Sequence, residues 1–302
     1  MIYDDKIDED KQSLYENRII YSLPVRLGLW NEDLALREDK NATTAYKRDH
    51  CQLLIQKTKK MMRNIMKPTS LAHETAFVSY GENYQIKTSD LTERLTFTDS
   101  SKGLFLSGLI TEREIDTCQH FRHGCMLTAS PIKDSIVRNT FKIVGCGRDK
   151  EGEQVVCGED ILIQISENTG PPLYVQCENS TMDTFGRPLS LRLSTVPDFY
   201  CRFKVFHWDP QRREETVGTP FVPDTRIIIQ HSASGQNLAV EPNRWIPTFF
   251  GPECTVSCRT CRDSHKMETR ENFWCLATTP KSNKNLFVRA AKGEDISSDI
   301  FE

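Results

Sequence analysis

Residues 158–164 read GEDILIQ, in which a polar turn with a glycine leads into a short run of β-prone apolar residues. A turn followed by such a run predicts a β-strand. Two other stretches repeat the arrangement, residues 81–86 (GENYQI) and residues 223–228 (PDTRII). The three stretches follow one another at intervals of roughly 70 residues, which indicates an internally repeated fold.

Each of these predicted strands is followed by two further β-type runs. A short apolar run comes first, at residues 103–106, 172–175 and 237–240. A strand with aromatic residues closes each set, at residues 140–144 (TFKIV), 202–206 (RFKVF) and 272–276 (NFWCL). The three-fold pattern predicts a mainly β protein, either a β-trefoil or a related closed β-barrel with three strand repeats. The intervals exceed the usual trefoil repeat, so long loops are required, and two small barrels in tandem are an alternative.

The clearest helix candidate precedes the β-rich region and lies between about residues 49 and 66. Apolar residues recur there at helical spacing, and Pro68 follows them. Basic residues occupy the remaining positions, among them Lys59, Lys60 and Arg63, and no acid occurs between residues 51 and 73. This short basic helix is either a scaffold helix with a solvated face, a contact for an acidic partner surface, or a calmodulin-target-like helix.

Residues 21–33 precede this helix and read YSLPVRLGLWNED. Val25, Leu27 and Leu29 alternate with an arginine and a glycine, which predicts an extended segment with one apolar face. The stretch contains no His, no Cys and no Gly-rich phosphate loop. We therefore interpret it as an anchor and not as a catalytic segment.

These patterns divide the chain into three expected parts. Residues 1–75 form an N-terminal extension with the anchor and the basic helix. Residues 76–279 form the β-rich, trefoil-like domain, and residues 280–302 form a polar, acidic tail. The first 20 residues and the tail are poor in apolar side chains, so we expect a partner to order them.

Composition narrows the function classes. The chain has 302 residues, a net charge of −3 and 38% apolar residues, which is enough to bury a sizeable core. The charge gives no global reason to expect nucleic acid or an acidic membrane as a partner. No apolar run is long enough to span a membrane, and the acidic start does not resemble a secretory signal. The eleven cysteines are therefore expected to be reduced thiols in a cytosolic compartment.

Two clusters contain residue types that bind metals. The first has the spacing of an iron–sulfur triplet or of a zinc site: Cys254, Cys258, Cys261 and His265. The second lies within CQHFRHGC: Cys118, His120, His123 and Cys125. The first cluster is not surrounded by the βα repeats of radical enzymes, so we expect a loop with free thiols there. The second cluster is too short to surround one tetrahedral ion, so we expect a polar loop. The glycines of residues 145–152 have the wrong spacing for a dinucleotide loop and predict a hairpin turn. We predict no cofactor, no metal and no enzymatic activity.

Several of these stretches carry a family resemblance. YSLPVRLGLWNED resembles the N-terminal signature of the cilia- and flagella-associated protein 161 family. YGENYQI from Tyr80 and RNTFKIV at residues 138–144 are similar to further motifs of that family. So is the block over residues 249–274, with its FFG, its DSH, Asn272 and Trp274. The resemblance extends over roughly residues 21–279.

The resemblance implies a non-enzymatic microtubule inner protein of the axonemal doublet in cilia and flagella. Such a protein lies in the lumen of the A-tubule, contacts tubulin and neighbouring inner proteins, and supports ciliary beating. The signature supplies the implied contact residues: Arg26, Trp30, Asn31, Glu32 and Asp33. Packing of Trp30 against the barrel is the alternative for that residue. The charge pattern adds Lys59, Lys60 and Arg63 as partner-binding candidates.

A soluble β-trefoil module that binds a sugar or a lipid headgroup is the competing hypothesis. Lectin-type trefoils present an aromatic platform with a carboxylate or an amide beside it. Trp208 next to Asp209, and Trp245 near Asn243, could form such platforms.

Overall fold

The computed structural model describes residues 30–73, 76–89, 103–147, 150–166, 170–179 and 186–279. Arg26, the alternating apolar positions before Trp30, and both polar tails lie outside the described residues. The chain divides into two compact units, Met1–Lys59 and Lys60–Glu302, and each is described by itself. No helix within the described ranges is both long and apolar enough to span a membrane.

The described part of the first unit begins with helix α2 (Trp30–Asp49). Acids occupy its first turn and Lys47 and Arg48 its last, which complements the helix dipole. Asn31 to Asp33 are therefore helical, and the prediction of an extended segment is wrong from Trp30 onward. The physical reason is that Leu, Ala, Arg, Glu and Lys dominate residues 34–40, and these residues favour a helix over a strand.

The basic helix α3 (Leu54–Ile65) begins later than predicted. Residues 49–53 hold the end of α2 and a turn, in which Cys51 has a positive φ of 54°. Gln56 stabilises this turn with its side-chain amide. Its Nε2 donates to the carbonyl of Arg48 over 3.0 Å, and its Oε1 accepts from the backbone N–H of Leu53 over 3.3 Å. Helix α3 ends before Pro68, as the sequence predicts.

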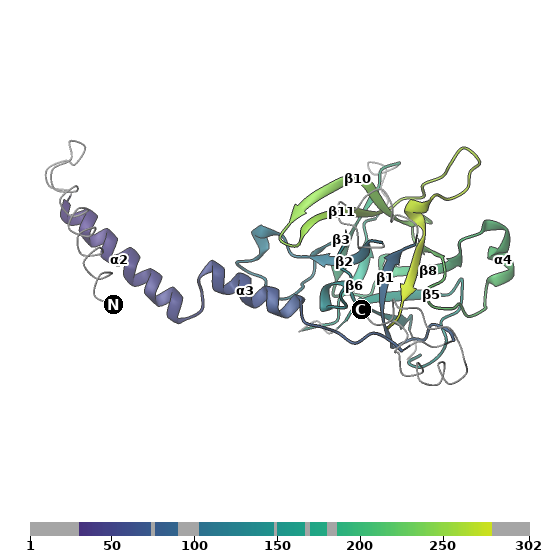
Figure 1. Ribbon diagram of the computed structural model, residues 1–302, viewed down its shortest axis with the longest axis horizontal. Helices are drawn as coiled ribbons and strands as arrows, with labels where there is room; N and C mark the ends of the chain where they lie inside the picture. Colours follow the sequence, from purple (N-terminus) through teal and green to yellow (C-terminus); the bar gives the residue numbers. More distant parts are fainter. Residues whose placement is uncertain are drawn as a thin grey trace, which may run out of the picture. The chain divides into compact units, whose positions relative to one another are not determined.

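Six antiparallel strands of the second unit form a closed ring, and Figure 1 labels three of them, β1, β5 and β8. They are β1 (Asn83–Thr88), β4 (Phe141–Gly145), β5 (Asp160–Ile165), β8 (Arg202–His207), β9 (Ile227–His231) and β12 (Trp274–Ala277). Each pairs with the next in this order, and β12 pairs with β1 to close the ring. The three predicted opening runs are β1, β5 and β9, and the three predicted closing runs are β4, β8 and β12. The prediction of a mainly β, closed antiparallel barrel is confirmed.

The other six strands form three hairpins that meet one another. The hairpins are β2 (Phe105–Leu109) with β3 (Met126–Ser130), β6 (Tyr174–Cys177) with β7 (Leu189–Ser194), and β10 (Leu238–Thr248) with β11 (Gly251–Cys258). Their second strands contact each other as β3–β7, β7–β11 and β11–β3. The described strands all belong to one twelve-stranded sheet, so two barrels in tandem are excluded.

Short helical segments connect the strands. They are η1 (Glu112–Glu114), η2 (Val137–Asn139), η4 (Phe199–Cys201), η5 (Pro210–Arg212), α4 (Arg213–Thr216) and η6 (Arg270–Asn272). Three of them, η2, η4 and η6, stand directly before the closing strands β4, β8 and β12. Residues 154–156 make isolated bridges, from Gln154 to Ser79 and from Val156 to Pro220.

The core fills the inside of the ring and the space beneath the hairpins. Each closing strand contributes one fully buried aromatic residue: Phe141, Phe203 and Trp274. Met61 and Ile65 of α3 belong to the same apolar cluster, so this helix is fixed to the barrel by its apolar face. Burial of such side chains contributes about 1.5–3 kcal/mol each relative to exposure.

Candidate interaction surface

Helix α2 presents its side chains to solvent. Residues 31–50 are all exposed, including the signature residues Asn31, Glu32 and Asp33. Apolar residues are among them, with Leu34 46% exposed, Leu36 54% and Tyr46 57%. Trp30 begins the helix, but its side chain lies outside the described set. The described side chains of this helix therefore include apolar groups that lie in contact with solvent.

Helix α3 is amphipathic in the sense that the sequence predicts. Met61 and Ile65 are buried, whereas Lys59, Lys60 and Arg63 are exposed. This arrangement disfavours the calmodulin-target hypothesis, because calmodulin-like grooves bind the apolar face of a helix and here the barrel core already holds it. The basic face remains as the surface that a partner can reach.

A loop from a distant part of the sequence lies against α3. The Nδ2 of Asn64 donates to the carbonyl of Gln119 over 3.1 Å and lies 3.3 Å from Nδ1 of His120. Burial lowers the pKa of His120, and the nearby cations Lys60 and Arg122 lower it further. We call Lys60, Arg63, His120 and Arg122 the cationic surface. The loop half of this surface cannot be predicted from local sequence, because folding brings the loop to α3 from 55 residues along the chain.

The first metal candidate separates into different environments. Cys254 and Cys258 are buried side chains of strand β11, Cys261 is half-buried in the segment that follows, and His265 is exposed. In the second candidate, Cys118 and Cys125 are buried, whereas His120 is half-buried and His123 exposed. Within the described ranges, no three His, Cys, Asp or Glu side chains lie together in a way that could hold a metal ion.

Two thiols of these clusters, Cys125 and Cys254, are protonated at neutral pH. Burial raises the pKa of Cys254 to about 12 and, as the largest cause, that of Cys125 to about 11. Because a raised pKa keeps the thiol protonated up to that pH, both side chains are poor nucleophiles and poor metal ligands at pH 8. Cys51, in contrast, is exposed.

Alkylation of the native chain tests this assignment. At pH 8 we expect iodoacetamide to modify Cys51 within minutes, while Cys125 and Cys254 react only after denaturation. Mass spectrometry of tryptic peptides, taken at several times, measures the order. Equal rates for Cys51 and Cys254 in the folded protein would contradict the burial that the fold assigns to β11.

The motif residues that carry the family resemblance have structural roles. The Oδ1 of Asn139 accepts from the backbone of Ile136, and the Oδ1 of Asn272 accepts from the backbone of Cys261 over 2.7 Å. Their amide groups donate to four carbonyls in total, two for each asparagine. Asp263 of the DSH motif accepts from the backbone of His265 and Met267 and so forms a turn. These motif residues therefore maintain the fold.

A buried ion pair links two further motifs. The Nη2 of Arg138, in RNTFKIV, lies 2.8 Å from Oε1 and 3.0 Å from Oε2 of Glu253, and both residues are fully buried. Phe250, in the FFG turn, places its ring 3.7 Å below the guanidinium carbon. Thr128 donates to the same carboxylate over 2.7 Å. The pair therefore connects the segment before β4 to the β10–β11 hairpin.

The two tryptophans of the ligand-binding alternative make intramolecular contacts. Trp245 packs against the core and donates its indole N–H to the carbonyl of Pro242. Trp208 meets the ring of Phe273 edge-on, and Arg226 lies over its face at 4.9 Å. Neither indole is an open platform for a sugar.

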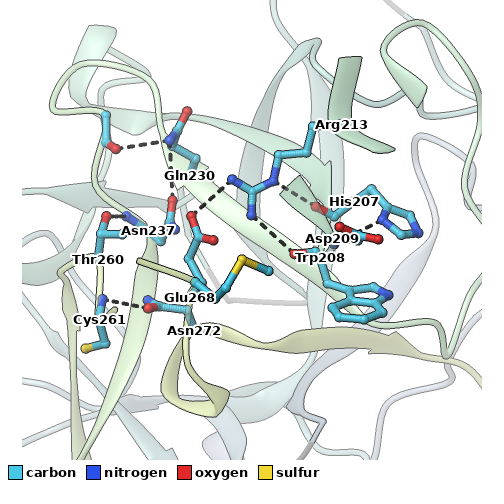
Figure 2. A network of polar contacts seen from close by, with 12 residues as sticks. His207, Trp208, Asp209, Arg213, Gln230, Asn237, Thr260, Cys261, Glu268 and Asn272 are labelled. Carbon is cyan, nitrogen blue, oxygen red and sulfur yellow. Dashed lines mark hydrogen bonds and ion pairs between the residues drawn. The ribbon is translucent and has the colours of Figure 1, made fainter. Parts of the chain in front are cut away.

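Figure 2 shows the polar network around Trp208, in which Arg213 connects three parts of the chain. Its guanidinium donates to the carbonyls of His207 and Trp208 and pairs with Glu268 over 3.0 Å. Burial tends to raise the pKa of Glu268, but the hydrogen bond from Arg213 outweighs it together with the other favourable contacts, so the pKa is lowered. The network is a structural clamp between the segment after β8 and the loop before β12.

Comparisons with known proteins identify one family and several relatives. A model of the cilia- and flagella-associated protein 161-like domain matches residues 57–186 and 185–279. The cilia- and flagella-associated protein 161 of Mus musculus is 29% identical over 295 residues, covering 94% of each chain. That of Danio rerio is 26% identical over 271 residues, covering 88% of this chain and 90% of the relative. Among solved structures, the SDF2-like protein from Arabidopsis thaliana is 15% identical with a TM-score of 0.46, covering 68% of this chain and 98% of that one.

Proposed function

The chain belongs to the cilia- and flagella-associated protein 161 family, and on that premise we propose that it is a structural microtubule inner protein of axonemal doublets. It lies in the lumen of the A-tubule, contacts tubulin and neighbouring inner proteins, and supports ciliary stability and beating. The observation that carries the proposal is the family match, which covers most of helix α3 and the whole described barrel. The protein has no enzymatic role in this proposal.

The division into two units supports a role as a connector. The barrel has one continuous core, whereas α2 has exposed apolar residues, Leu34, Leu36 and Tyr46. Helix α2 is the proposed contact for a partner in the lumen, and the basic face of α3 is a second contact. Two contacts on one repeating lattice raise the effective concentration of each and make the chain slow to leave.

We also infer that the barrel is a β-trefoil. The ring of six strands and the three hairpins that meet through β3, β7 and β11 support this assignment. The equivalent positions of η2, η4 and η6 before the closing strands support it as well. A trefoil suits a structural role because its closed ring leaves few free strand edges that could pair with other chains.

Stepwise extraction of tagged protein from isolated axonemes tests the proposed function. Detergent comes first, then high salt, then a reagent that dissolves part of the doublet wall. We expect the chain to stay through detergent and salt, because the wall encloses it, and to be released only when the wall opens. Release by detergent or by salt alone would contradict a lumenal position, since salt removes contacts between exposed charges.

Substitutions in α2 test whether this helix contributes to assembly into axonemes. We expect Leu34→Glu together with Leu36→Glu to reduce the fraction assembled into axonemes several-fold, because charges replace the apolar contact. Glutamate is a good helix former, so the helix itself is retained. Thr43→Glu, an exposed change on the same helix, is the matched control and should assemble normally. Equal assembly of all three proteins would remove α2 as a contact.

A further inference from the structure

The cationic surface is held in place before any partner arrives. Met61 and Ile65 fix the rotation of α3 by burial, so that Lys60 and Arg63 face outward. The loop is fixed by Phe121, which is 2% exposed and packs on the backbone of Gly108. A Cβ at position 108 would lie only 2.7 Å from the Phe121 ring, which shows how close this packing is. A preformed surface loses little conformational entropy when it binds.

Within the described ranges, the charges of this surface are not neutralised by an ion pair. Among the ion pairs of the described residues, none includes Lys60, Arg63 or Arg122. Arg122 is exposed, and its backbone N–H donates to the Sγ of Cys125 over 3.3 Å, which holds the turn of the loop. Lys60 and Arg122 both act on the His120 imidazole, and Arg63 is exposed on the same helix as Lys60, so the surface is complementary to an anionic ligand.

The contacts of Asn64 fit a neutral His120. The Gln119 carbonyl can only accept, so the Nδ2 of Asn64 is the atom that donates to it. The same Nδ2 lies 3.3 Å from Nδ1 of His120, and a hydrogen bond there requires the tautomer in which Nδ1 accepts and carries no proton. Protonation at Nδ1 would break this arrangement. The charged groups that act on the ring are Lys60 from α3 and Arg122 from its own loop, and both oppose protonation.

We propose that the cationic surface binds a carboxylate-rich segment of a partner protein and that His120 takes up a proton when this segment binds. A carboxylate beside Lys60 and Arg122 offsets their repulsion and adds an attraction to the imidazolium. The inference rests on the proposed function, because it assumes that a partner binds at α3. It adds that the binding part of this partner is a protein segment rich in Asp and Glu.

The sign of the pH dependence follows from linkage. The pKa of His120 is lowered in the free protein and is higher in the complex, where a carboxylate is near. Affinity therefore rises as the pH falls from above the bound-state pKa to below the free-state pKa. Above this window the ring is neutral in both states, and below it the ring is charged in both, so affinity is constant outside it.

Fluorescence anisotropy of the full chain with a labelled peptide of ten glutamates tests the inference. At low salt we expect saturable binding that is about three- to tenfold tighter at pH 6.0 than at pH 7.5, consistent with uptake of one proton. His120→Gln should keep binding but lose this pH dependence. His123→Gln, which changes an exposed histidine three residues away, is the matched control and should retain it. Lys60→Gln and Arg122→Gln should weaken binding at both pH values.

Three results would overturn the inference. They are the absence of saturable binding, a pH dependence that survives His120→Gln, and tighter binding of inorganic polyphosphate than of the peptide, which would assign the surface to phosphate. Thermal melting of each variant confirms that it is folded. The two proposals can be contradicted independently. If the chain stays in axonemes but does not bind the peptide, only the inference on the cationic surface is wrong. If the chain binds the peptide but is extracted from axonemes by salt, only the proposed function is wrong.

Discussion

Replacing Arg138 with Met is expected to lower the free energy of unfolding by about 3–5 kcal/mol, because it leaves a buried carboxylate without its counter-charge. Arg138 and Glu253 are each fully buried, and their charged atoms approach to 2.8 Å. The guanidinium also donates through Nε to the carbonyl of Gly108 over 3.2 Å and rests on the ring of Phe250. The substitution thus removes three contacts that join η2, β2 and the β10–β11 hairpin.

The double variant Arg138→Met with Glu253→Leu is the control. Removing both charges leaves no isolated ion, so we expect it to recover most of the lost stability. Urea unfolding followed by circular dichroism measures both variants. A single variant within 1 kcal/mol of the wild type would contradict the buried pair. A double variant as unstable as the single one would show that packing, and not charge, is what the pair supplies.

The second large effect is expected at Trp274, the first residue of β12. Its side chain is fully buried, and its indole N–H donates to the carbonyl of Leu238 over 3.0 Å. Trp274→Ala should cost about 3–5 kcal/mol, because it opens a cavity inside the ring. Trp274→Phe should cost about 1–2 kcal/mol, because the Leu238 carbonyl keeps its second donor, Asn272.

Comparison of these two variants separates cavity formation from the lost hydrogen bond. Denaturant melts of the purified full chain give both values. If Trp274→Ala were no worse than Trp274→Phe, the aromatic side chain would not fill the core between β12 and the β10–β11 hairpin, and the ring closure at β12 would need revision.

The ring strands could be predicted because they contain runs of apolar residues that favour a buried β-strand. Strand β5 carries Ile161, Leu162 and Ile163 in a row, and all three are buried. Hairpin strands are different: β3 reads MLTAS, and β11 contains a glycine, a proline and two cysteines. Those strands form because three hairpins meet, which is a tertiary condition that no local pattern records.

The N-terminal error has a related cause. Residues 21–33 alternate in polarity up to Leu29, and that alternation was extended across Trp30. The helix formers that follow decide the conformation from Trp30 onward, and acids in the first turn favour the helix start. The composition of residues 34–40 alone predicts a helix at this place.

The sequence predicts the α3 residues of the candidate surface but not the loop residues. Helical spacing places Met61 and Ile65 on one face of α3 and the basic residues on the other, which identified Lys59, Lys60 and Arg63. His120 and Arg122 join this surface because Asn64 bonds to a loop 55 residues further along the chain. Local spacing suggested metal ligands there, and only the packed barrel shows a cationic loop.

Cryo-electron microscopy of doublets from ciliated cells with and without the chain tests the central claim most directly. The account predicts a difference density of the size of the barrel inside the A-tubule, with a helical density for α2 on an adjoining tubulin or inner protein. Identical lumens in the two maps, or a difference density confined to the outer surface of the doublet, would contradict it.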